Sequence, residues 1–114
     1  MNECLFCRIA AGSIPADIIH EDDEFLAFRD INPQAPTHFL VIPRSHIAAL
    51  SDLSAEHADT MGRLAVTASR VARDEGLDQR GYRWVVNCGE DGCQTVPHLH
   101  LHVLGGRPLG LPPG

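Results

Sequence analysis

Apolar residues recur at helical spacing in two segments of the chain. In the first segment, residues 4–11, the side chains of Leu5, Phe6 and Ile9 fall on one side of a helix, and Gly12 ends the pattern. This spacing predicts a short helix near the start of the chain.

The second segment predicts one long helix. Ser54 is a preferred N-cap residue, Glu56 favours the first turn, and Gly76 is typical of a helix end. One apolar stripe between these residues consists of Met61, Leu64, Ala65, Ala68, Val71 and Ala72. The stripe predicts an amphipathic helix that starts at Ser54 and closes at Gly76.

Short runs of β-branched and aromatic residues predict the strands. The runs are residues 18–21, 25–28, 38–42, 82–87 and 98–104. Turn-forming residues separate the first three runs, so these three are expected to pair as an antiparallel meander. Together with the helices, they indicate a single domain over residues 1–114.

Charge and hydropathy narrow the classes of partner. The net charge is −6, which opposes non-specific binding to nucleic acid or to an anionic membrane, because phosphate backbones attract clustered Lys and Arg. No basic segment followed by an apolar run begins the chain, and no stretch approaches 18 apolar residues. We therefore expect a cytoplasmic protein with no nucleic-acid or membrane partner, in which any bound phosphate is held by local groups.

The last predicted strand carries the most distinctive chemistry. Residues 98–103 read His-Leu-His-Leu-His-Val, so in a strand the rings of His98, His100 and His102 share one face. A neutral imidazole can attack an electrophile such as phosphorus, and a protonated one can stabilise negative charge. A surface strand or a metal-binding strand would also fit the bare pattern.

The loop before these histidines has the composition of an anion site. Residues 87–95 contain two glycines, whose turn can expose backbone N–H groups, and Gln94 and Thr95 can each add a hydrogen bond to phosphate. A flexible hairpin loop is the alternative, and the adjacent histidines favour the anion site. Cys88 and Cys93 in this loop are expected to be free thiols rather than a disulfide or a second metal site.

Residues 98–104 follow the complete pattern His-φ-His-φ-His-φ-φ, where φ is hydrophobic, and on this pattern the chain resembles the Hint branch of the histidine triad superfamily. The likeness extends to residues 27–43, 81–83, 85–87 and 105–107. It implies a HIT-like α+β fold: a twisted antiparallel sheet of about five strands with one long and one short helix, continued across a homodimer. It also implies a hydrolase of purine nucleoside phosphoramidates that releases AMP or GMP without an organic cofactor.

The resemblance assigns roles to four histidines. His100 would be the nucleophile toward the α-phosphorus, and a backbone carbonyl near His98 would hold its ring in the attacking tautomer. His102 would donate to a phosphate oxygen, and His38 would support the cluster. A histidine at position 102 resembles the hydrolase branches, because transferase relatives commonly have glutamine there.

The resemblance also implies a nucleotide site. Asp30 would accept hydrogen bonds from ribose hydroxyls, Asn87 would lie near the phosphate, and Gln94 and Thr95 would touch the phosphate or the leaving group. Cys93 stands in the phosphate loop where relatives often have glycine. An apolar pocket for the base would be formed by residues for which core packing is the alternative role: Phe6, Ile9, Phe28 and Ile31.

A CxxC pair at Cys4 and Cys7 fits zinc binding, thiol redox chemistry or two core cysteines. Redox pairs usually follow a strand, whereas this pair precedes every predicted strand, so zinc is favoured over redox chemistry. The resemblance implies that His46 and His98 complete a structural zinc site. Such a site would clip the first helix to the last strand.

Two other functions remain open at this stage. A nucleotide-binding module that holds AMP or GMP with little turnover would use the same pocket. A structural zinc protein or a thiol oxidoreductase would depend on its cysteines and survive the loss of His100. The intact histidine pattern favours catalysis, because a binding pocket alone needs no nucleophile.

Overall fold

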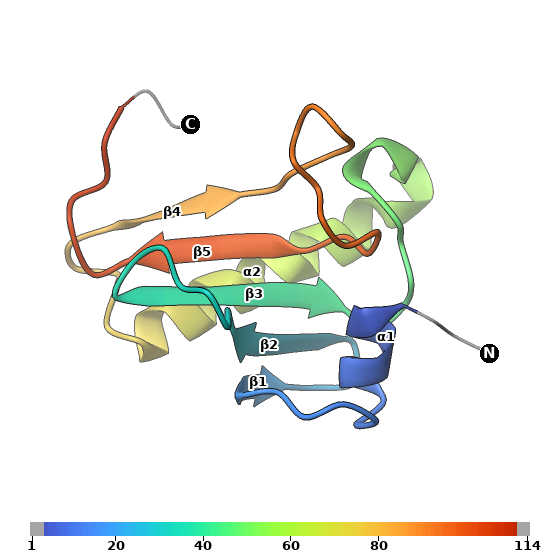
Figure 1. The fold of residues 1–114 in the computed structure, drawn as a ribbon, viewed down its shortest axis with the longest axis horizontal. Coiled ribbons are helices and arrows are strands. Elements are labelled where there is room, and N and C mark those ends of the chain that lie inside the picture. The colour runs from blue at the N-terminus through green and yellow to red at the C-terminus, as the bar shows by residue number, and fades with distance from the viewer. Residues whose placement is uncertain (1–3, 112–114) are drawn as a thin grey trace.

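The computed structural model describes residues 4–111 and shows one sheet with a helix on each face (Figure 1). The elements are α1 (Leu5–Ala10), β1 (Ile18–Glu21), β2 (Phe25–Arg29), β3 (Thr37–Pro43), α2 (Ala58–Asp74), β4 (Tyr82–Val85) and β5 (Leu101–Gly105). All neighbouring strands are antiparallel, in the order β1-β2-β3-β5-β4. The predicted α+β architecture, with five strands, one long helix and one short helix, is confirmed.

Alternating side chains of the central strands supply two apolar layers. The long helix α2 covers one face, in a cluster with Phe25, Ala27, Phe39, Val41, Leu101 and Val103. The short helix α1 packs on the other face, where Phe6 and Ile9 join Leu26, Phe28, Leu40 and Ile42. The long helix α2 therefore packs on the central strands from behind, while α1 covers part of the front of the sheet, beside the histidines.

The last strand begins later than the sequence predicts. Residues 98–104 were expected to be strand, but β5 starts at Leu101 and ends at Gly105. The reason lies in the backbone before it: the N–H of Leu99 donates to Ile47 O, and the carbonyl of His98 accepts from a side chain. These groups are thus withdrawn from the ladder that a strand requires.

The long helix also begins later than predicted. Ser54 does not cap α2; it precedes a 3₁₀ turn over Ala55–His57, and α2 starts at Ala58. The N–H of Ser54 donates to Nδ1 of His57, which stabilises this tighter turn. Strand β4 ends at Val85, two residues before the predicted end.

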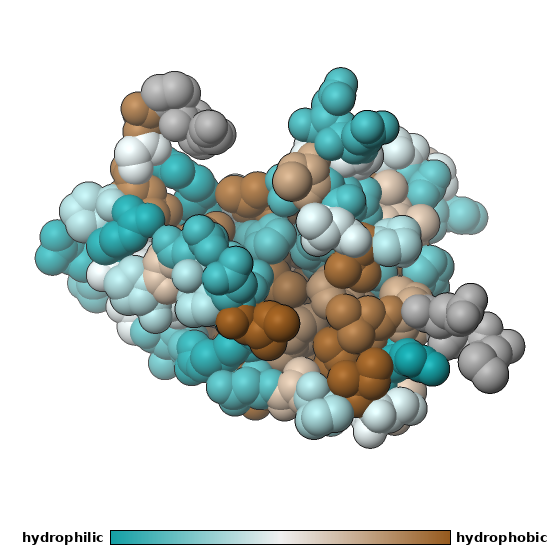
Figure 2. Space-filling view, viewed as in Figure 1, coloured by the Kyte–Doolittle hydropathy of each residue, from teal (hydrophilic) through white to brown (hydrophobic). Residues whose placement is uncertain are grey.

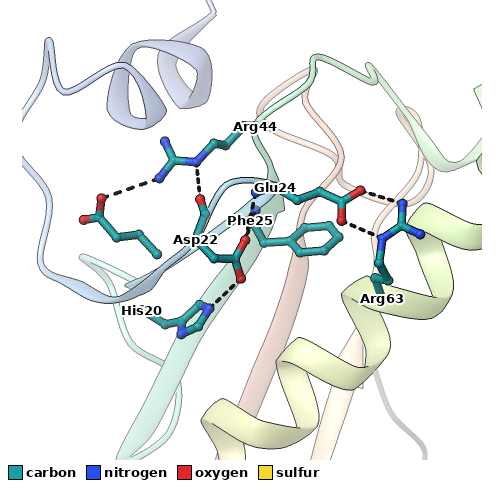
Figure 3. Close-up of polar contacts among 7 residues, drawn as sticks. His20, Asp22, Glu24, Phe25, Arg44 and Arg63 are labelled. Atoms are coloured by element: carbon teal, nitrogen blue, oxygen red, sulfur yellow. Dashed lines mark hydrogen bonds and ion pairs between the residues drawn. The ribbon is translucent and has the colours of Figure 1, made fainter.

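The turn between β1 and β2 is hydrogen-bonded to α2 and to Arg44, the residue after β3 (Figure 3). The Asp22 carboxylate accepts from the backbone N–H groups of Glu24 and Phe25, each at 2.8 Å. Two bonds from Arg63 of α2, at 2.6 and 2.8 Å, reach the Glu24 carboxylate. On the other side, Arg44 donates to the carbonyl of Asp22.

Within residues 4–111, no helix is long and apolar enough to cross a membrane.

Candidate functional site

The three alternating histidines lie together on the side of the sheet that carries α1. His98 and His100 are buried, at 0% and 4% exposure, and His102 in β5 is 16% exposed at its side chain. Phe6 of α1 packs edge-on against His98 and His100, with ring centroids 6.0 and 5.0 Å away, and the His100 and His102 rings lie 5.0 Å apart. Phe6 of the short helix thus restrains the rings of His98 and His100.

The hydrogen bond of His100 determines its tautomer. Its Nδ1 lies 2.6 Å from the backbone carbonyl of His98. A carbonyl oxygen only accepts, so Nδ1 carries the proton, and the lone pair is on Nε2. The bond therefore orients the His100 ring so that Nε2 is the nitrogen available as a nucleophile, as the family resemblance implies.

A second chain of hydrogen bonds determines the tautomer of His102. The backbone N–H of Gln34 donates to Nδ1 of His38 at 3.0 Å, which leaves the His38 proton on Nε2. That nitrogen is 2.9 Å from Nδ1 of His102 and 3.4 Å from Oδ2 of Asp30. Nδ1 of His102 is consequently an acceptor, and its Nε2–H is left as a donor.

Burial keeps these two histidines neutral. It lowers the pKa of His102 to about 4, and the nearby rings of His100 and His38 act in the same direction, while Asp30 opposes them. Burial also lowers the pKa of His38, although Asp30 again favours the charged form. The pair therefore supplies oriented neutral donors near pH 7.

A hollow of about 400 Å³ lies between α1 and the end of β2, and Figure 2 shows apolar surface over α1 beside it. Ile9, Phe28, Asp30 and Ile31, which the resemblance assigns to a base and ribose pocket, together line this hollow. Ile31 is fully exposed at its edge. Phe6 is not part of the lining; it packs beneath against Phe28, with ring centroids 5.4 Å apart.

The predicted phosphate loop contains a hydrogen-bonded turn, in which the N–H groups of Cys93 and Gln94 donate to the carbonyls of Glu90 and Gly89. Asn87 and Gln94 are half-buried, and Cys93 and Thr95 are exposed. Cys93 has φ of 61°, and it is the single non-glycine residue with positive φ within residues 4–111. Cys88 and Cys93 are free thiols, as expected.

The four predicted zinc ligands converge at one end of the histidine row. Nδ1 of His98 lies 3.3 Å from Sγ of Cys4 and 3.5 Å from Sγ of Cys7. Sγ of Cys7 lies 3.3 Å from Nδ1 of His46, and all four donor atoms fall within 4.8 Å of one another. Tetrahedral zinc with its usual bond lengths separates such ligands by about 3.3 to 3.8 Å, so the cluster fits the metal.

The protonation of His98 supports the same assignment. Its Nε2 lies 2.8 Å from the carbonyl of Pro43, so Nε2 carries the proton and Nδ1 presents a lone pair to the two sulfurs. Burial lowers the pKa of His98, which favours the neutral form that binds metal.

Apart from the carbonyl of His98, the backbone partners in the site were not predicted from the sequence. The Gln34 N–H, the Pro43 carbonyl and the Ala48 carbonyl all orient functional side chains. Every residue except proline offers the same backbone groups, so no side-chain pattern signals which of them will be used.

Comparison with known proteins gives four consistent matches. Residues 11–109 match the model of the HIT domain. The chain is 48% identical over 109 residues to the purine nucleoside phosphoramidase of Escherichia coli (strain K12), covering 96% of this chain and 92% of that protein. The crystal structure of a HIT family hydrolase from Legionella pneumophila Philadelphia 1 superposes with a TM-score of 0.97 at 49% identity, covering 98% of this chain and 100% of that one. A zinc-bound histidine triad family protein from Mycobacterium smegmatis gives a TM-score of 0.77 at 40% identity, covering 92% and 76%.

Proposed function

The chain belongs to the HIT domain family, and on that premise we propose that it hydrolyses purine nucleoside phosphoramidates and releases AMP or GMP. The observation that carries this proposal is the His100 ring, whose Nδ1–H is bound to the His98 carbonyl so that Nε2 is free to attack. A pocket that only bound nucleotide would not require this tautomer.

Two displacements at phosphorus make up the reaction. Nε2 of His100 attacks the α-phosphorus, the P–N bond breaks, and its electron pair leaves on the amine, which takes up a proton from solvent as it departs. The Nε2–H of His102 donates to a phosphate oxygen as charge builds there. Water then attacks the same phosphorus, releases the nucleotide and restores His100.

The nucleotide occupies the hollow beside α1. Its base packs on Ile9, Phe28 and Ile31, and the Asp30 carboxylate accepts from the ribose hydroxyls. The phosphate lies toward the loop with Asn87, Cys93 and Thr95, and toward His102.

Zinc is the metal that the cluster of Cys4, Cys7, His46 and His98 would hold. Four protein ligands fill a tetrahedral shell, so the ion would be structural and would leave no open position for substrate. It would join α1 to the segment before β5, and a zinc-bound relative of the same family supports this choice.

A homodimer is proposed for the assembly. Within residues 4–111, strand β4 lies at an edge of the sheet and pairs only with β5, and its Trp84 is 41% exposed. An open strand edge with an exposed aromatic residue is suited to pairing with a second copy of the chain, which would continue the sheet. The mass of the protein in solution, measured by light scattering, tests this.

The test of the function is release of AMP from adenosine 5′-phosphoramidate by the wild type and by His100→Ala, with folding of both checked by circular dichroism. We expect turnover that is abolished in the folded variant. Nucleotide binding without turnover in the wild type would instead favour the alternative, a nucleotide-binding module.

A further inference from the structure

The side chain of Gln94 is fully engaged by the protein itself. Its Nε2 donates to the carbonyls of Ala48, at 2.8 Å, and Val96, at 3.0 Å, and its Oε1 accepts from the N–H of Gly89 at 3.1 Å. Both amide hydrogens are therefore used, and the side chain joins the two ends of the phosphate loop to each other and to a third segment.

That third segment, residues 46–48, contacts each part of the site through successive residues. His46 contributes a donor atom to the Cys/His cluster, and the carbonyl of Ile47 accepts from the N–H of Leu99 at 2.6 Å. Leu99 lies between His98 and His100, and the next carbonyl, that of Ala48, accepts from Gln94. The 46–48 segment thus links the cluster, the backbone of the histidine run and the loop.

We infer that Gln94 is a positioning residue, which couples the order of the Cys/His cluster to the phosphate loop through the 46–48 segment. The family resemblance implies that Gln94 touches the phosphate or the leaving group, but a direct bond from Nε2 to phosphate would require Gln94 to give up the carbonyl of Ala48 or Val96. The side chain instead keeps the loop formed before nucleotide arrives.

Backbone hydrogen exchange in the absence of nucleotide separates these two roles. The reporter for the loop is the Cys93 N–H, which donates to the Glu90 carbonyl and is not a partner of the Gln94 side chain. The reporter for the 46–48 segment is the Leu99 N–H. The amides of α2 serve as the reference for global folding, because that helix packs on the opposite face of the sheet.

The variant is Gln94→Met, which keeps the side-chain length and removes every polar atom, and the control is Glu90→Gln at the exposed tip of the same loop. In Gln94→Met we expect exchange at Cys93 to rise by roughly tenfold or more, because the two donated bonds and one accepted bond are lost. Leu99 and α2 stay protected, and the control matches the wild type.

The link to the cluster is tested by removing zinc with a chelator. In the wild type, exchange at both Leu99 and Cys93 should rise, whereas in Gln94→Met only Leu99 should respond, because the loop is already uncoupled. If chelation also exposes α2, His46→Asn removes a single ligand at the exposed side of the cluster and carries the same two expectations.

Two results would overturn the inference. The first is that Gln94→Met does not change the exchange rate of the Cys93 amide in the nucleotide-free protein. In that case the remaining role for Gln94 would be a direct contact with nucleotide. The second is that loss of zinc or of His46 raises exchange at the Leu99 amide while the Cys93 amide of the same protein stays protected.

The catalytic consequence rests on the proposed function. In Gln94→Met, part of the free energy of nucleotide binding is used to order the loosened loop. KM for the phosphoramidate should therefore rise roughly tenfold. kcat should change less than about twofold, since the His98 carbonyl still orients His100. A fall in kcat with KM unchanged would contradict this, whereas inactivity of the wild type would refute the proposed function and leave the exchange experiment intact.

Discussion

Protonation of His102 should weaken the fold in a defined pH range. Its pKa is lowered from 6.5 to about 4 by burial and by the neighbouring rings of His100 and His38. In the unfolded chain the same side chain takes up a proton near pH 6.5. Between these values only the unfolded state binds the proton, so the free energy of unfolding falls as the pH is lowered.

The magnitude follows from the gap between the two pKa values. At about 1.4 kcal/mol per pH unit, lowering the pH from 6.5 to 4 costs roughly 3 kcal/mol through His102 alone. Below pH 4 both states are protonated, and this contribution stops changing. The side chain is only 16% exposed, so solvent screens the effect little.

The assay compares urea unfolding of zinc-loaded wild type and His102→Gln from pH 7 to pH 4. Glutamine stays neutral and can still accept from Nε2 of His38, so the variant should lose about 1.4 kcal/mol per unit less than the wild type below pH 6.5. His20→Gln, in β1 and away from His38, His100 and His102, controls for loss of a histidine. Parallel curves for wild type and His102→Gln would refute the reasoning.

Three further predictions concern the loop, the metal and the ribose. Cys93→Gly should raise the free energy of unfolding by about 0.5 to 1 kcal/mol in thermal denaturation, because glycine tolerates φ of 61°, whereas Cys93→Ala should not; an equal effect of both would contradict this. Cys7→Ser should abolish stoichiometric zinc, measured by elemental analysis, and destabilise the fold by at least about 2 kcal/mol, while Cys88→Ser should keep the metal. Asp30→Asn should raise KM for ribonucleoside substrates roughly tenfold to a hundredfold but leave KM for dideoxy analogues nearly unchanged, and equal losses on both would exclude ribose contact.

Side-chain patterns were sufficient to predict most of the fold. The apolar stripe of the long helix and the β-branched and aromatic runs of β2 and β3 are properties of side chains, and both consist largely of residues that are buried in the structure. The borders of elements depend instead on backbone partners. Leu99 donates to Ile47 rather than to a neighbouring strand, and this moves the start of β5 to Leu101.

The site shows the same division. The identities of His98, His100 and His102 predict the chemistry, and the cluster of cysteines and histidines forms where the resemblance placed it. The resemblance implied the carbonyl near His98 that orients His100, whereas the carbonyl of Pro43 and the N–H of Gln34, which set the tautomers of His98 and His38, carry no sequence signature. The packing of Phe6 beneath the hollow, rather than in its wall, likewise depends on how α1 is seated.

The most direct test of the central claim is the stereochemical course at phosphorus. The wild type would hydrolyse one epimer of an adenosine 5′-phosphoramidate with a single sulfur on phosphorus, in water labelled with heavy oxygen. Each in-line displacement inverts phosphorus, so attack by His100 followed by attack by water predicts net retention of configuration. Net inversion would show a single displacement by water and would contradict a nucleotidyl-histidine intermediate.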